Sequence, residues 1–189
     1  MRILMLGNSF TYFHDMPVML AHLTGAEVVA HTRGGAFLME HLNPEEELGA
    51  KTLPALQNEK WDYVILQEQS KAPAVARAEF QRSAAELCKL ICANGAVPVF
   101  YATWAYREGS ERLAATGYSY KEMEDALTDS YRCAAEANEG LIAYVGKAFT
   151  ALRGVAELYE ADDFHPSAAG SMLAAATLAR VILDHAKEA

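Results

Sequence analysis

Five short apolar runs, separated by segments with helical periodicity, constrain the fold of this chain more than any other feature. Most of the runs are rich in Val, Ile, Leu and Tyr, as is typical of strands that are buried on both faces of a sheet. Strands that alternate with helices predict a parallel sheet with helices on both faces. The predicted strands cover residues 3–6, 27–31, 63–67, 97–103 and 142–145.

Helical patterns fill the segments between the predicted strands. Residues 43–47 read Asn-Pro-Glu-Glu-Glu, which is typical of an N-cap, a first-turn proline and an acidic first turn. Pro54 is expected to end or kink the helix that follows, and Asn94-Gly95 is expected to stop the next one. The other predicted helices cover 16–23, 74–93, 120–137 and 167–187. These elements predict one three-layer α/β/α domain over residues 1–189, with a five-stranded parallel sheet.

The composition excludes two kinds of partner. The chain has a net charge of −9 and no basic cluster, so we expect it to bind neither nucleic acid nor anionic membrane surfaces. No apolar run approaches the length of a membrane span. The first strand begins at residue 2, which predicts no signal peptide and a cytoplasmic location. A chain whose signal peptide had been removed would have the same appearance.

The cysteine pattern predicts neither disulfides nor a metal site. The sequence contains three cysteines, Cys88, Cys92 and Cys133. We interpret them as reduced, buried thiols, because free cysteine behaves as a small hydrophobic residue. The combination of His14-Asp15 with Asp163 matches no recognised ligand spacing. We therefore predict that the protein uses no metal and no cofactor.

The first apolar run stops at Gly7-Asn8-Ser9. A serine directly after a buried strand lies at the sheet edge where α/β proteins bind ligands. Its hydroxyl becomes a nucleophile when a base removes its proton. Ser9 is therefore the candidate nucleophile. The alternative interpretation is that Ser9 only caps the helix that starts near Asp15.

An acid and an imidazole lie three positions apart in Asp162-Asp163-Phe164-His165-Pro166. His165 is the candidate general base, because imidazole can accept a proton at neutral pH. Asp162 is the candidate acid that orients His165, and Asp163 is its rival. The five other histidines, interpreted as ordinary surface or core residues, are His14, His22, His31, His41 and His185.

These residues resemble the motifs of the SGNH, or GDSL-type, hydrolases. That family has its serine in a Gly-Asp-Ser motif after the first strand, and its acid and base in a late Asp-x-x-His. The matching positions here are Gly7-Asn8-Ser9, Asp162 and His165, with Asn8 in place of the usual Asp and Phe10 in place of the usual Leu. The resemblance implies the flavodoxin-like SGNH hydrolase fold and a serine esterase with a Ser-His-Asp triad.

Acyl transfer also needs hydrogen-bond donors aimed at the developing oxyanion. The backbone N–H of Ser9 is one expected donor. The resemblance implies a second from a glycine after the second strand, where Gly34 and Gly35 stand, and Gly35 is favoured.

The third oxyanion donor departs from the family pattern. The usual Gly-x-Asn-Asp is missing after the third strand, where residues 66–70 read Leu-Gln-Glu-Gln-Ser. A glutamine can supply a side-chain amide in place of asparagine. Gln67 is the expected replacement and Gln69 the alternative, while an ordinary surface role for Gln67 stays open. Some carbohydrate-esterase relatives are similar here, having a Gln-Gly-Glu-type block.

Aromatic residues near the predicted sheet edge are candidates for a substrate pocket. Phe10 follows the serine, and Trp104 and Tyr106 follow the fourth strand. Each is equally compatible with a place in the core. The stretch 105–118 has no clear period, contains two glycines and lies at the same sheet edge, so we expect it to form a rim that selects substrates.

The residues together predict a serine esterase that hydrolyses an acyl ester, with a slight preference for an acetyl ester on a carbohydrate. The expected partner is a small-molecule or carbohydrate ester. Two alternatives stay open: an acyltransferase that uses the same site, and a non-catalytic ligand-binding module with the same fold. The sequence specifies neither the particular ester nor the oligomeric state.

Overall fold

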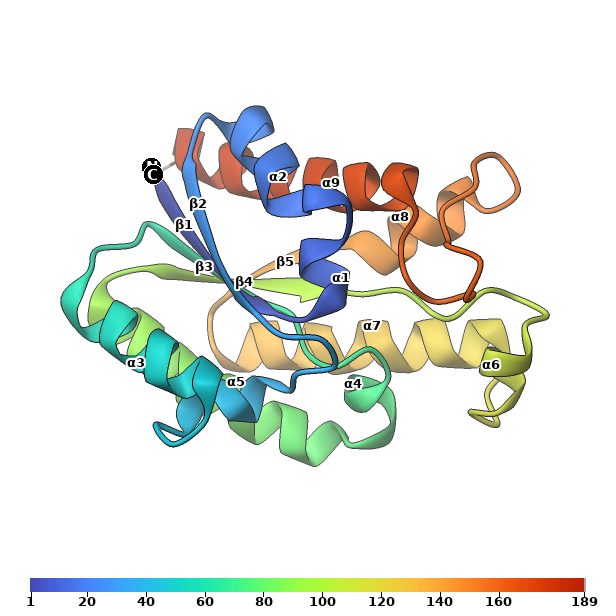
Figure 1. Cartoon of the computed structure of the whole chain (residues 1–189), viewed down its shortest axis with the longest axis horizontal. Helices are drawn as coiled ribbons and strands as arrows, with labels where there is room; N and C mark the ends of the chain where they lie inside the picture. The colour runs from blue at the N-terminus through green and yellow to red at the C-terminus, as the bar shows by residue number, and fades with distance from the viewer. Residues whose placement is uncertain (189) are drawn as a thin grey trace.

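The computed structural model describes residues 1–188 and contains a five-stranded, fully parallel sheet with the strand order β2-β1-β3-β4-β5. Helices cover both faces of the sheet (Figure 1). This arrangement confirms the predicted α/β class and the five parallel strands. The strands are β1 (Arg2–Gly7), β2 (Glu27–Thr32), β3 (Tyr63–Leu66), β4 (Val97–Ala102) and β5 (Leu141–Tyr144).

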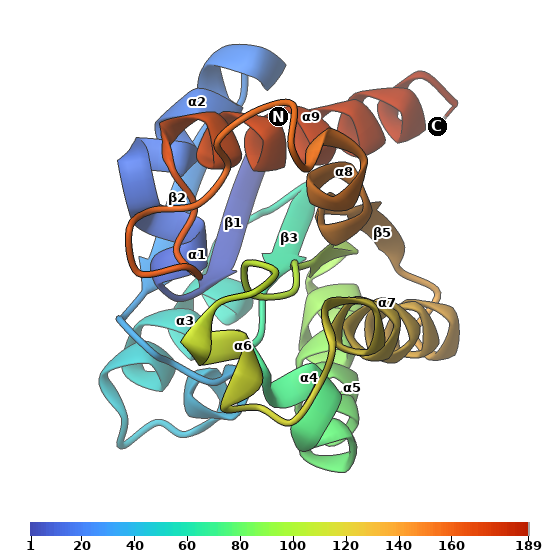
Figure 2. The same cartoon turned by 90° about the vertical axis from the view of Figure 1, so that its right-hand side faces the viewer.

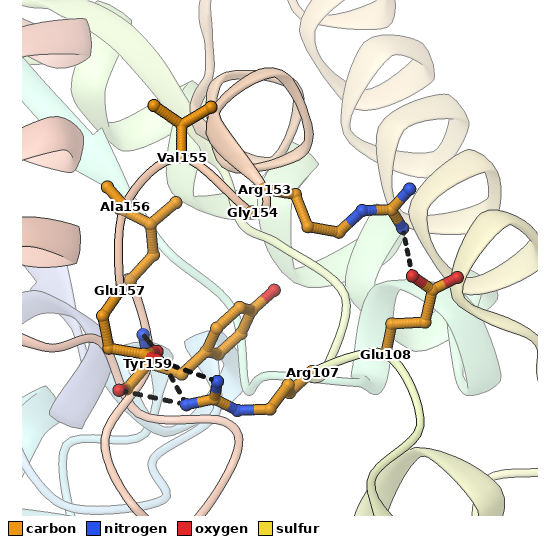
Figure 3. A pocket seen from close by; sticks show the side chains of 9 residues that line it. Arg107, Glu108, Arg153, Gly154, Val155, Ala156, Glu157 and Tyr159 are labelled. Atoms are coloured by element: carbon orange, nitrogen blue, oxygen red, sulfur yellow. Dashed lines mark hydrogen bonds and ion pairs between the residues drawn. The ribbon is translucent and has the colours of Figure 1, made fainter.

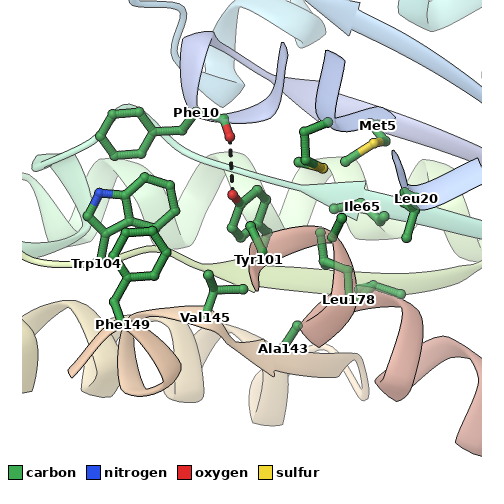
Figure 4. Packing of buried hydrophobic residues seen from close by; sticks show 14 of the residues in the cluster. Met5, Phe10, Leu20, Ile65, Tyr101, Trp104, Ala143, Val145, Phe149 and Leu178 are labelled. Carbon is green, nitrogen blue, oxygen red and sulfur yellow. Dashed lines mark hydrogen bonds between the residues drawn. The ribbon is translucent and has the colours of Figure 1, made fainter. Parts of the chain in front are cut away.

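The sheet is central because its strands are apolar on both sides. Along β1, Ile3 and Met5 pack into one core while Leu4 and Leu6 pack into the other. This alternation follows from the two-residue period of a strand. Figure 4 shows part of the first core, in which Met5, Ile65 and Leu178 lie together.

The helices form two outer layers (Figures 1 and 2). One layer contains α2 (Met16–Thr24), α8 (Val145–Leu152) and α9 (Ala168–Glu188), and α2 packs along α9 although they lie near opposite ends of the chain. The other layer contains α3 (Glu47–Asn58), α5 (Arg77–Asn94) and α7 (Tyr120–Ala137). The short helical segments are α1 (Ser9–Tyr12), η1 (Phe13–Asp15), η2 (Leu38–Leu42), α4 (Ala72–Val75) and α6 (Glu111–Ala114).

The prediction for the start of α3 is wrong. Asn43 follows η2, and its side-chain oxygen accepts a hydrogen bond from the N–H of Glu45, so it forms a local turn and no helix cap. The helix begins only at Glu47. Pro54 lies inside the helix and does not end it. A proline in a helix interior costs about 3 kcal/mol, and burial of neighbouring side chains such as Leu56 offsets this cost.

Two further expectations need correction. The predicted helix 74–93 is divided at Ala76, whose φ of −131° and ψ of 46° are not helical, and α5 then ends at Gly95 as expected. All three cysteines are free, but only Cys88 is buried; Cys133 is partly exposed and Cys92 is exposed. Burial raises the pKa of the Cys88 thiol to about 12.

Within residues 1–188, none of the helices combines the length and the apolar character needed to cross a membrane.

Candidate active site

Ser9 is placed by the tight junction between β1 and α1. Asn8 caps α1, because its side-chain oxygen accepts a hydrogen bond from the N–H of Phe10. Gly7 is required at the end of the strand, since a Cβ there would lie 2.5 Å from Thr11 Oγ1 and 2.6 Å from Gln67 Oε1. Ser9 therefore stands at the first position of α1, at the carboxyl end of the sheet.

His165 reaches Ser9 from the segment that precedes α9, which comes alongside α1 in Figure 2. His165 Nε2 lies 2.8 Å from Ser9 Oγ. His165 Nδ1 lies 2.5 Å from Asp162 Oδ2, and the other oxygen of Asp162 accepts the backbone N–H of His165 at 3.0 Å. Asp162 thus fixes both the ring and the backbone of His165. Partial burial acts to raise the pKa of Asp162, but the hydrogen bonds from His165 outweigh it and lower that pKa.

Two aromatic rings hold the imidazole in place. Phe13 stacks on His165 with ring centroids 4.2 Å apart and planes within 2° of parallel. Phe164 lies on another side of the ring, at 3.9 Å. The arrangement leaves Nδ1 to Asp162 and Nε2 to Ser9. The sequence gives no local signal for the stacking of Phe13 on His165, because the two residues lie 152 positions apart.

Asp163 has a different role from Asp162. Its carboxylate lies 2.7 Å from Arg107 Nε, and its backbone has a φ of 68°. No contact between its carboxylate and His165 is seen among the described residues. The acid in contact with His165 is Asp162.

A pocket of about 550 Å³ opens beside Ser9 and His165. Two of the three aromatic candidates, Phe10 and Tyr106, line it. Trp104 does not line it and is completely buried. The Trp104 ring stacks between Phe10 and Phe149 at centroid distances of 4.6 and 4.1 Å (Figure 4), and its N–H donates to the carbonyl of Phe164. Trp104 therefore supports the segment that carries His165.

Backbone donors for an oxyanion are present around this pocket. Ser9 is the first residue of α1, where a helix leaves its N–H groups without an intrahelical partner. Gly34 and Gly35 both line the pocket. Only Gly35 has a left-handed backbone, with a φ of 71°, so the turn itself requires glycine at this position.

The two glutamines have different environments. Gln67 is fully buried and is not one of the residues that line the pocket. Its Oε1 accepts the N–H of Asn8 and the hydroxyl of Thr11, each at 2.9 Å, and its Nε2 donates to the carbonyl of Glu68. The expectation that Gln67 supplies the oxyanion donor disagrees with these contacts. Gln69, the alternative, does line the pocket.

Asn8 connects the loops around the site. Its amide nitrogen donates to the carbonyl of Ala36 at 3.0 Å and lies 3.5 Å from the carbonyl of Glu68. An Asp at this position has no hydrogen to donate to either carbonyl. The contacts give a physical reason for asparagine where the family usually has aspartate.

A buried carboxyl, Glu68, lies behind the pocket. It accepts the N–H of Leu38 at 3.2 Å and the N–H of Gln69 at 2.6 Å, so it holds the loops that follow β2 and β3. No basic side chain among residues 1–188 pairs with it. Burial raises the pKa of Glu68 to about 7, although the two N–H groups act to lower it.

The raised pKa of Glu68 predicts a pH-dependent stability. A group that binds its proton more tightly in the folded state loses stabilisation as pH rises from its ordinary pKa, 4.5, to about 7. We expect a loss of about 3 kcal/mol in the free energy of unfolding over that range. The Glu68→Gln variant cannot titrate, so its curve should lack this loss.

Urea unfolding of both proteins from pH 4.5 to 7.5 measures the difference. The comparison is necessary because His41 acts oppositely: burial lowers its pKa to about 3, so its contribution grows as pH rises. That contribution is common to both proteins and cancels. Parallel curves would contradict the burial of a titrating carboxyl at position 68.

A second cavity, of about 430 Å³, lies between the loop after β4 and the loop after α8. Its arginines are paired within the protein: Arg107 with Glu157, and Arg153 with Glu108 (Figure 3). None of its lining residues lines the Ser9 pocket. In the described part of the chain, no three His, Cys, Asp or Glu side chains are grouped closely enough to hold a metal ion.

The fold is that of the SGNH hydrolases. A protein from Slackia heliotrinireducens that is assigned to these hydrolases is 48% identical to this chain, with a TM-score of 0.93 over 96% of this chain and 98% of that one. At this identity and coverage, the chain belongs to the SGNH hydrolase family.

More distant structures share the fold alone. A DUF4886 family protein from Bacteroides uniformis is 22% identical, with a TM-score of 0.74 over 96% of this chain and 82% of that one. A variant of Axe2, an acetyl-xylooligosaccharide esterase from a Geobacillus, is 17% identical, with a TM-score of 0.70 over 96% of this chain and 93% of that one. No protein-family profile and no curated protein matches the chain.

Proposed function

We propose that this SGNH hydrolase is a serine esterase that works through an acyl-enzyme. The observation that carries the proposal is the continuous chain of contacts from Ser9 Oγ through His165 to Asp162, with distances of 2.8 and 2.5 Å. In this mechanism His165 takes the hydroxyl proton while Ser9 Oγ bonds to the ester carbonyl carbon. The proton then passes to the departing alcohol. Water repeats the sequence to release the acid and restore Ser9.

The oxyanion in this proposal is held by three donors. Two are the backbone N–H groups of Ser9 and Gly35, residues that line the pocket. The third is the side-chain amide of Gln69, whose orientation is supported by two local contacts. Its Oε1 accepts the N–H of Lys71 at 3.2 Å, and its Nε2 lies 3.2 Å from Ser70 Oγ. Preorganised donors of this kind stabilise the charge that develops in the transition state.

The proposed substrate is a short acyl ester, with acetylated carbohydrates as the first class to test. Two observations support this choice. The pocket is lined both by the proposed catalytic side chains and by exposed residues such as Tyr12, so Ser9 lies close to the protein surface, which suits a small acyl group. A structural neighbour of the same fold acts on acetylated xylo-oligosaccharides.

Two measurements test the proposal. Turnover of a panel of 4-nitrophenyl esters of increasing chain length, together with acetylated xylo-oligosaccharides, should show hydrolysis with a preference for short acyl groups. A serine-reactive phosphonate should give one adduct per chain, located on Ser9 by peptide mapping. Hydrolysis without labelling of Ser9, or no reaction in either assay, would overturn the proposal. Product analysis with added alcohols separates hydrolysis from acyl transfer.

A further inference from the structure

The pocket beside Ser9 has a charge opposite to that of the whole protein. The chain has a net charge of −9, yet the residues lining this pocket include Lys71 and Arg112 and no Asp or Glu. Most arginines of this chain are paired with carboxylates, as Arg107 is with Glu157. Within residues 1–188, neither Lys71 nor Arg112 forms an ion pair with an acidic side chain.

Arg112 is held in place by groups that leave its charge available. Its guanidinium carbon lies 3.8 Å from the centre of the Phe164 ring, and its Nε–H donates to the backbone carbonyl of Asp162 at 3.2 Å. The two terminal nitrogens make no hydrogen bond with the described residues. Because Phe164 also contacts the ring of His165, the guanidinium is fixed one aromatic ring away from the proposed base.

Lys71 lies in the loop after β3, whereas Arg112 lies in α6, which follows β4. It follows Gln69 by two positions, and its backbone N–H fixes the Gln69 side chain. Its ammonium group has no hydrogen-bond partner within residues 1–188. Both cations also line an adjoining hollow of about 520 Å³, so they stand where this hollow meets the Ser9 pocket.

Within residues 1–188, the acidic groups of the adjoining hollow form no ion pair with these cations. Asp162 is bound to His165 and Asp163 to Arg107. Glu111 also lines the hollow and precedes Arg112 in the chain, but it forms no ion pair with Arg112 or Lys71. The hollow therefore contains both signs of charge, whereas the Ser9 pocket itself is lined by the two cations and by no Asp or Glu. A planar guanidinium with free terminal nitrogens matches a carboxylate group in geometry and charge.

We propose that the natural substrate is an ester that carries an anionic group, a carboxylate in the first instance, and that Lys71 and Arg112 bind this group while Ser9 attacks the ester carbonyl. The inference rests on the proposed esterase function. It narrows the substrate class from esters in general to acidic esters, such as acylated acidic sugars or esters of dicarboxylic acids.

The test uses ester pairs that differ in one charge. The first pair places the charge on the acyl group: 4-nitrophenyl hydrogen glutarate against 4-nitrophenyl pentanoate. The second places it on the alcohol: 3-acetoxybenzoate against its methyl ester. For at least one pair, we expect kcat/KM to be about tenfold higher for the anion at low ionic strength, the size of one charge-assisted contact. Salt should reduce this ratio because it screens exposed charges.

Variants of Lys71 and Arg112 distinguish an effect on charge selectivity from a general effect on catalysis. The ratio of anionic to neutral kcat/KM should fall to about one in Arg112→Gln with Lys71→Gln, and should stay high in Arg112→Lys, which keeps the charge. The ratio cancels any disturbance of the Phe164 segment, because both esters meet the same catalytic residues. Arg82→Gln removes an exposed charge on α5, away from the pocket, and should leave the ratio unchanged.

The outcomes are distinct. A ratio at or below one for both pairs, or a high ratio that survives loss of both cations, would overturn the acidic-ester proposal while the esterase function stands. If none of the four esters is hydrolysed, the esterase function on which the proposal rests would be refuted.

Discussion

Replacing Ser9 with alanine should lower kcat/KM for an activated ester by about 10⁴-fold or more, while the protein stays folded. The reason is that the hydroxyl 2.8 Å from His165 Nε2 is that of Ser9, and no other hydroxyl within residues 1–188 bonds to this nitrogen. In the described part of the chain, the Ser9 hydroxyl has no hydrogen-bond partner besides His165, so its loss should change the fold little. Steady-state kinetics and a thermal melt on the same sample measure both effects.

A neighbouring serine provides the matched control. Ser70 also lines the pocket, and its hydroxyl lies 2.8 Å from the hydroxyl of Tyr106. Ser70→Ala removes one of the two contacts that orient Gln69, so it should lose some activity but far less than Ser9→Ala, and it should still be labelled at Ser9 by a phosphonate. A folded Ser9→Ala protein with turnover near that of the wild type, or labelling that moves to Ser70, would refute the assignment of the nucleophile.

The second large effect is a loss of kcat that we expect on replacing Gln69 but not Gln67. Gln69→Ala should lower kcat by about 10²–10³ with little change in KM, the usual cost of removing one oxyanion donor. Its melting temperature should change little, because the side chain is only partly buried and bonds only to near neighbours. Steady-state kinetics on one activated ester measure the change in kcat, and a thermal melt measures the change in melting temperature.

Gln67→Ala should show the opposite profile. It leaves the N–H of Asn8 and the hydroxyl of Thr11 without their buried acceptor, and each unsatisfied group costs about 1–3 kcal/mol. We therefore expect a lower melting temperature, and any loss of activity should accompany looser placement of Ser9. If Gln69→Ala is fully active and Gln67→Ala is stable but slow, the roles of the two residues must be exchanged.

The sequence was sufficient to predict the fold because the fold depends mainly on where apolar residues occur along the chain. Short apolar runs between amphipathic segments leave few ways to bury every strand, and the parallel order follows from the helical connections. Boundaries were predicted less well. Pro54 disfavours a helix locally, yet α3 continues through it because burial against the sheet outweighs the local preference.

The site was predictable only where a motif fixes a residue type. Ser9, Asp162 and His165 were identified from short motifs, and the structure brings them into contact. The residues that support them have no such signal. Gln67 and Gln69 are the same residue type two positions apart, and only their partners distinguish them. Those partners, Asn8 and Thr11 for Gln67, lie more than 50 positions away in sequence.

The contact between Ser9 and His165 also has a kinetic consequence. It joins residues 156 positions apart, and the helices that follow the two residues, α2 and α9, pack against each other. Contacts at such separations form late, since the entropy of closing a long loop must first be overcome. A partly folded chain in which this contact is absent has Ser9 without its proposed base. In the proposed mechanism, recovery of turnover during refolding therefore requires the contact between Ser9 and His165 and reports a late step of folding.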